Sequence, residues 1–116
     1  MNETEYRQVL EKAKALVASG WTQGASARDQ SGHPCLPLSA FVHTWCFLGA
    51  CENALFVNGH DEDAWLDLIA VLKRAISASG EISPIVWNDA LEREQPEVLA
   101  LFDKTIESLA SNESPQ

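Results

Sequence analysis

The chain has 116 residues, 46% of them hydrophobic, and a formal net charge of −9 from 17 acidic and eight basic residues. This length suits a single hydrophobic core, and four Trp and four Phe residues argue against disorder. The charge argues against direct nucleic-acid binding, which needs Lys and Arg to neutralise phosphates, but it leaves open a basic protein partner or a role in solubility alone.

The first predicted element is a helix over residues 3–19. Its apolar residues recur at i, i+3, i+4 and i+7, the spacing of one buried helix face. Asn2 or Thr4 is suited to cap its start, and Gly20 is suited to the position just after its end. The residues of the predicted buried face are Tyr6, Val9, Leu10, Ala13, Leu16 and Val17.

A long connection without helical periodicity follows, from residue 21 to residue 39. Residues 29–32, Asp-Gln-Ser-Gly, are typical of a turn, and two prolines after them disfavour a helix. We therefore expect a small β-hairpin that pairs residues 24–28 with residues 33–36. Long ordered connections in compact domains are often functional.

The segment 41–56, FVHTWCFLGACENALF, is predicted to form the central helix of the domain. It is apolar in almost every direction, which is typical of a helix that is buried on several sides. Phe41 and Trp45 belong to its predicted buried surface. Ser39 is a suitable N-cap, and we expect this helix to end near Val57.

The last third of the chain predicts two further helices. Asp61 is suited to cap a third helix, which Gly80 ends, with a core stripe of Leu and Ile. Residues 81–95 are predicted to be irregular. Pro96 fits the first position of a last helix, from residue 96 to about residue 110.

These elements predict an all-α fold. We expect one domain over residues 1–110, a small bundle of four main helices around the buried central helix, and a flexible polar tail over residues 111–116. The long connection would lie against this bundle. Nothing in the pattern predicts the oligomeric state.

Cysteine usage and the start of the sequence bear on the compartment. No basic segment followed by an apolar run opens the sequence, so we expect no secretory signal and a cytoplasmic protein. No apolar run reaches the roughly 20 residues that a membrane-spanning helix needs. Cys35, Cys46 and Cys51 are expected to be reduced core thiols.

Four short blocks occur in a fixed order along the chain. They are GWTQG at 20–24, ARD at 27–29, WC-x-x-GA at 45–50 and WND at 87–89. Together they resemble an uncharacterised bacterial and phage family, a domain of unknown function. The resemblance implies no activity, only positions at which to look for a site. These positions are Trp21, Asp29, Trp45, Cys46, Gly49, Trp87, Asn88 and Asp89.

The predicted site lies where the long connection meets the WND segment. Trp21 and Trp87 would form apolar walls, and Asp29, Asn88 and Asp89 would supply polar groups for a ligand or a partner. The alternative interpretation is structural. In that case Trp87 fills the core, and the polar side chains bond to nearby backbone in turns.

Catalytic and metal chemistry have weaker sequence support. Cys46 with His43 one turn earlier is a conceivable nucleophile and base, but a thiol in the middle of a buried helix is expected to be inert. His43 and Cys46 are two candidate metal ligands, with Cys35, Cys51, Asp29 or Asp89 as the others, yet no paired ligand motif is present. We expect no metal and no cofactor.

The leading functional hypothesis is a non-enzymatic small accessory protein, cytosolic or phage-encoded, that binds a partner protein or a small ligand. A first alternative is an acidic inhibitor that mimics nucleic acid, such as an anti-defence protein, and occupies a basic surface of another protein. A second alternative is an enzyme that uses Asp29, Cys46 or Asp89.

Overall fold

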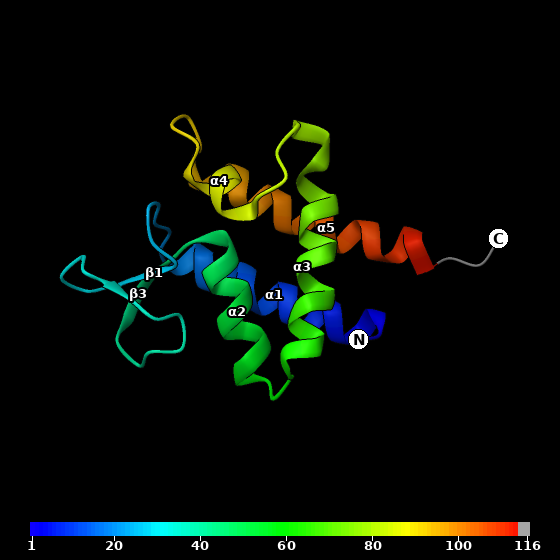
Figure 1. Ribbon diagram of the computed structural model, residues 1–116, viewed down its shortest axis with the longest axis horizontal. Helices are drawn as coiled ribbons and strands as arrows, with labels where there is room; N and C mark the ends of the chain where they lie inside the picture. The colour runs from blue at the N-terminus through cyan, green and yellow to red at the C-terminus, as the bar shows by residue number, and fades with distance from the viewer. Residues whose placement is uncertain (114–116) are drawn as a thin grey trace.

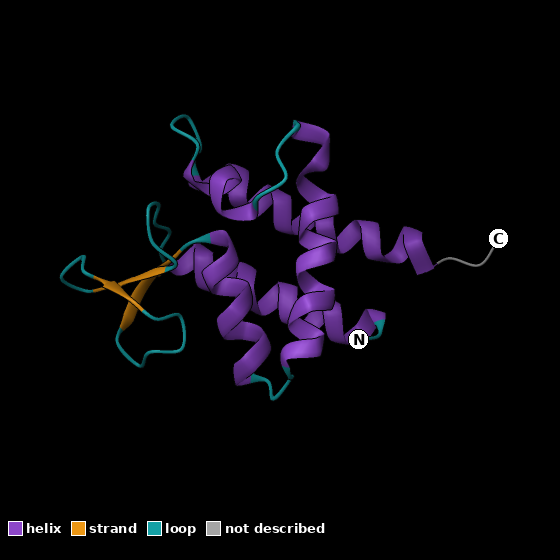
Figure 2. Ribbon diagram, viewed as in Figure 1, coloured by secondary structure: helices purple, strands orange, loops and turns teal. Residues whose placement is uncertain are grey.

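The computed structural model describes residues 1–113, which form five α-helices, a short 3-10 helix and a three-stranded sheet (Figure 1). The sheet projects from one end of the helical part of the molecule (Figure 2). The elements in chain order are α1 (Glu3–Ser19), β1 (Ala27–Asp29), β2 (Pro34–Cys35), β3 (Val42–Trp45), α2 (Phe47–Val57), α3 (Glu62–Ile76), η1 (Ser77–Ser79), α4 (Pro84–Asp89) and α5 (Gln95–Glu113).

The prediction of an all-α fold is wrong, because the domain is mixed α/β. The strand order is β2-β1-β3, and both pairings are antiparallel. The hairpin itself lies where it was predicted, since Ala27 pairs with Cys35 and Arg28 pairs with Pro34. What the prediction lacked is the third strand, β3, which pairs with the other side of β1.

The strand β3 comes from a segment that was assigned to the central helix. Val, Thr and Trp in this segment favour extended structure. Its last residue, Trp45, has partners on both sides. It pairs with Ala27 of β1 on one side. On the other side its N–H donates to the carbonyl of Gly20, and its carbonyl accepts the N–H of Thr22. Phe41, which was predicted to be buried, is 80% exposed. Tertiary pairing therefore overrides the apolar pattern of this segment.

The helix α2 begins at Phe47 rather than near residue 40. Its N-cap is Cys46, whose Sγ accepts the N–H of Gly49 at 3.1 Å. The N–H of Cys46 donates to the carbonyl of Ser26 at 3.0 Å. The predicted cap, Ser39, instead accepts the N–H of Phe41 in a turn. The first turn of α2 is thus set by the loop before β1.

The core lies between α1, α2, α3 and α5. The helix α1 packs against both α2 and α5, and α3 contacts α2 and α5. The ring of Phe47 lies between two aromatic rings, with centroid distances of 5.7 Å to Trp87 and 4.8 Å to Phe102. Aromatic side chains contribute the largest buried areas to such a core. Phe47, at the start of α2, therefore connects α4 with α5.

The remaining predicted helices agree better with the structure. The helix α1 has the predicted extent, and Asp61 caps α3 as predicted, by accepting the N–H of Ala64. The helix α3 ends at Ile76, and the 3-10 helix η1 continues to Ser79 before Gly80, the predicted end. The helix α4 lies in a segment that was predicted to be irregular. The helix α5 is described as far as Glu113, and residues 114–116 of the predicted tail lie outside the described residues. No described helix is long and apolar enough to cross a membrane.

Where the sheet meets α2, we expect the substitution of Gly49 by Ala to destabilise the protein. A Cβ atom at Gly49 would overlap the carbonyl oxygen of Ser26. Gly49→Ala is therefore expected to lower the free energy of unfolding by ~1–3 kcal/mol. If residues 41–57 formed one regular helix, the same change would raise it by up to ~1 kcal/mol. Urea denaturation distinguishes the two outcomes by their sign.

Candidate functional site

The polar centre of the structure is the fully buried side chain of Asn88. Its Oδ1 accepts the indole N–H of Trp21 at 2.8 Å and the backbone N–H of Phe47 at 2.9 Å. Its Nδ2 donates to the carbonyl of Thr22 at 3.1 Å and to Oδ1 of Asp89 at 2.9 Å. An amide side chain has two donor hydrogens and two acceptor lone pairs, so Asn88 makes all the hydrogen bonds that its side chain can make. The amide joins three parts of the chain.

The short helix α4 places Asn88 at this centre. Ser83 caps α4 by accepting the N–H of Val86, and Pro84 occupies the first turn. The buried residues Pro84, Trp87 and Asn88 have the i, i+3, i+4 spacing of one helix face. That face is turned into the domain.

The side chain of Gln23, which the sequence analysis did not single out, also bonds the long connection to α4. The amide of Gln23 donates to the carbonyls of Asn88 and Ala90, both at 2.9 Å. Gly24 donates its N–H to Oδ1 of Asp89 at 3.0 Å. Gln23 and Gly24 lie in the GWTQG block, so that block was the available signal for their role.

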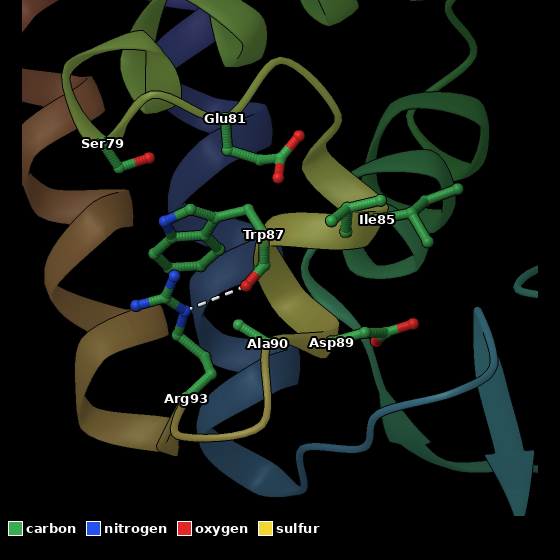
Figure 3. Close-up of a pocket in the computed structure, with 8 residues that line it drawn as sticks. Ser79, Glu81, Ile85, Trp87, Asp89, Ala90 and Arg93 are labelled. Atoms are coloured by element: carbon green, nitrogen blue, oxygen red, sulfur yellow. Dashed lines mark hydrogen bonds between the residues drawn. The ribbon is translucent and has the colours of Figure 1, made fainter.

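Trp87, on the same buried face of α4 as Asn88, fills the core. Its ring packs against Phe47, and the guanidinium carbon of Arg93 lies 3.9 Å from the ring centroid. Arg93 also donates from Nε to the carbonyl of Trp87 at 2.9 Å, as Figure 3 shows. The structure thus supports the structural interpretation of Trp87 and Asn88, since both stabilise the arrangement of helices.

Asp29 lies outside this cluster. Its Oδ1 accepts the N–H groups of Ser31 and His33, at 2.9 and 3.0 Å, in the turn of the hairpin. It borders a hollow with Phe41 and His43, whereas Asp89 borders a hollow beside α4. The structure therefore brings together Trp21, Asn88 and Asp89, with Trp87 beside them, and leaves Asp29 at the sheet.

The thiol of Cys46 is at a helix N-terminus, not in mid-helix as predicted. Burial raises its pKa, the N–H groups of Gly49 and Leu48 oppose this, and the carboxylates of Asp89 and Glu52 raise it further. Burial also raises the pKa of Cys51. Burial thus outweighs the helix N-terminus, and both groups are held as thiols rather than as reactive thiolates. Within residues 1–113, no three His, Cys, Asp or Glu side chains are placed to hold a metal ion.

Two hollows lie beside α4 and share three residues, Ser79, Trp87 and Arg93. One hollow, of about 370 Å³, extends toward Glu81, Ile85 and Asp89. The other, of about 330 Å³, extends between η1 and α5. We call the two together the α4 groove. Its further lining residues are Val86 and Ala90 on the first side, and Ala75, Ile76, Ala78, Glu97, Ala100, Leu101 and Lys104 on the second.

These features define a small mixed α/β domain in which a buried asparagine fastens an irregular connection to a short helix with an exposed outer face. Over residues 1–108 the chain matches a family of unknown function, DUF6197, and it belongs to this family. The resemblance to an uncharacterised family is thereby confirmed, while the bacterial or phage origin stays a prediction. No curated protein and no solved structure matches the chain.

The two polar residues of the WND block are expected to respond differently to substitution. Asn88→Ala leaves the N–H of Phe47 and the indole N–H of Trp21 without their acceptor, at ~1–3 kcal/mol for each buried group. We expect a loss of about 2–6 kcal/mol in urea denaturation. Asp89→Asn keeps an acceptor oxygen for Gly24 and is expected to cost about 1 kcal/mol or less. Equal losses for both variants would contradict the central role of Asn88.

The three cysteines are expected to react with a thiol reagent in a set order. Cys35 is half-buried in β2 and should react first in the native protein. Raised pKa values and burial leave little accessible thiolate at Cys46 and Cys51, so these should react only when the protein unfolds, and raising the pH should favour their reaction. Mass spectrometry of labelled peptides measures this order. Early labelling of Cys46 would instead indicate an accessible nucleophile.

Proposed function

We propose that this protein is a non-enzymatic accessory protein that binds a partner protein through the outer face of α4. The observation that carries the proposal is a concentration of exposed apolar side chains. Among the described residues, nine large hydrophobic residues are exposed, and four of them lie between positions 82 and 91. Single exposed apolar residues are common on protein surfaces, but clusters mark interaction sites. These four residues are Ile82, Ile85, Val86 and Leu91.

Acidic residues accompany the residues of this apolar surface in the sequence. Glu81, Asp89, Glu92 and Glu94 accompany it along the chain, whereas the one basic residue among them, Arg93, is held against Trp87. Twelve of the 17 acidic residues but only four of the eight basic ones lie at positions 61–116, so this half carries a formal charge of −8. An apolar patch with such a rim suits a partner with apolar anchors flanked by Lys or Arg.

The surface is held rigidly by the network beneath it. The inner face of α4 is fastened through Asn88, and Gln23 bonds to the end of the same helix. A surface that is already ordered loses little conformational entropy when it binds. Trp21 and Asn88 therefore support the proposed surface from below, and Asp89 belongs to its rim.

The concentration of negative charge also favours a second candidate, an acidic inhibitor that occupies a basic surface. Such binding would be mainly electrostatic and would weaken strongly with salt, because the Debye length falls from about 10 Å at 0.1 M to about 3 Å at 1 M. Binding anchored by Ile85 and Val86 would persist at high salt. The salt dependence of the complex separates the two candidates.

We propose the cytoplasm as the compartment and a bacterium or phage as the source. The cysteines support the first point, because Cys35, Cys46 and Cys51 are all free in the structure. The order of the GW, WC-x-x-GA and WND blocks supports the second.

Site-specific photo-crosslinking tests the proposed surface. A photoreactive phenylalanine analogue is placed at Ile85 or Leu91 and irradiated in cells of the natural host. We expect both positions to crosslink to the same protein, because both side chains are about half exposed or more. Leu66, which is 64% exposed on α3, is the matched control and should give no adduct. Equal adducts from all three positions, or none from Ile85 and Leu91, would contradict the proposal.

A further inference from the structure

One polar group in the α4 groove lacks a partner, the indole N–H of Trp87. Trp87 is only 7% exposed, yet no acceptor among the described residues bonds to its Nε1. The equivalent group of Trp21 donates to Asn88 at 2.8 Å. Buried indole N–H groups normally have a partner. The groove therefore contains an unused donor.

This donor opens into the groove rather than into the core. Every fully buried side-chain nitrogen and oxygen among the described residues has a hydrogen-bond partner, so Nε1 of Trp87 must reach solvent. Trp87 borders both hollows of the groove. In Figure 3 the nitrogen-bearing edge of its ring faces Ser79. No hydrogen bond joins Nε1 to the Oγ of Ser79, which donates to the carbonyl of Ile76 at 2.6 Å. A ligand oxygen would therefore meet a free N–H at the middle of the groove.

The two ends of the groove differ in charge. On the α4 side, Glu81 lines the hollow, and its Oε2 has no partner among the described residues. The carboxylate of Asp89, which also borders this hollow, is turned away from Trp87 in Figure 3 and accepts from Gly24 and Asn88. At the middle, Arg93 and Glu97 pair with each other at 3.3 Å. The α4 side therefore favours a cation on the ligand.

The other side of the groove is largely apolar, although Glu97 and Lys104 also border it. Ala78 and Ala100 border the second hollow together with Leu101. Small residues leave room for an apolar side chain of a ligand. The groove thus combines a largely apolar recess, a hydrogen-bond donor shared by both hollows and an acidic side chain, Glu81. A peptide presents the same three features when a Lys or Arg and an apolar residue flank a backbone carbonyl.

We propose that the α4 groove binds a linear peptide segment of the partner. A backbone carbonyl of the peptide accepts the N–H of Trp87, a Lys or Arg lies beside Glu81, and an apolar side chain enters the recess near Leu101. This inference rests on the proposed function, because it specifies which part of the partner is recognised. It excludes docking by a flat folded surface alone.

A phage-displayed library of random linear dodecapeptides tests the inference. We expect selection on the wild-type protein to enrich sequences that combine Lys or Arg with Leu, Ile or Val. Synthetic copies should bind Trp87→Phe and Glu81→Gln at least about tenfold more weakly, equivalent to ~1.4 kcal/mol per tenfold. Leu66→Glu, a change on α3, is the matched control and should bind normally. Absence of enrichment, or equal binding to Trp87→Phe, would overturn the inference.

Nuclear magnetic resonance on the wild-type protein gives a readout that needs no folded variant. The indole ¹H–¹⁵N signal of Trp87 should shift when a selected peptide is added, because its N–H gains an acceptor. The signal of Trp21 should stay in place, since its N–H is already bonded to Asn88. A shift at Trp21 without one at Trp87 would contradict the proposed site.

The two proposals fail in different ways. If Ile85 crosslinks to a partner but no peptide is enriched, the surface is confirmed and the linear-peptide inference is wrong. If peptides bind at Trp87 but no crosslink to a host protein forms, the groove chemistry holds and the proposed function is wrong. A crosslink from Ile85 to a second copy of this chain would overturn the inference. So would a host small molecule that copurifies with the protein and that blocks peptide binding at Trp87.

Discussion

The buried amide of Asn88 is the interaction on which the rest of the structure depends. Its partners are the indole of Trp21, the carbonyl of Thr22, the first N–H of α2 at Phe47, and Asp89. Burying an amide is costly unless all its donors and acceptors are paired. All four bonds form only when the connection, α2 and α4 are in place together. The amide therefore links the junction of sheet and helices to the position of α4.

This constraint also explains why α4 can present an apolar outer face. A helix of six residues is not stable by itself, because nucleating a helical turn is unfavourable. Here Trp87 and Asn88 hold its inner face, while Ile85 and Val86 on its outer face remain exposed. The residues that stabilise the domain are thus neighbours of the residues proposed to bind, and substitutions must be judged by stability and by binding separately.

The candidate site could be predicted in part from the sequence. The GW and WND blocks indicate the two segments that meet, and Trp21, Asn88 and Asp89 do lie together. Asp29 does not join them, because the hairpin turn already supplies N–H groups for its carboxylate. Gln23 lies in the GWTQG block but was not singled out, because the block does not show that its side chain bonds to backbone carbonyls 65 and 67 positions away.

The sequence by itself determined the elements whose signals are local. Apolar spacing located α1 and α3, and the turn that begins at Asp29 located the hairpin. Only the tertiary structure decided that residues 42–45 form a strand and that α2 starts after Cys46. An apolar run is compatible with a buried helix or a buried strand, and the choice depends on the partner. The partners here, β1 and the carbonyl of Ser26, are distant in sequence, so their hydrogen bonds exist only after the chain has folded.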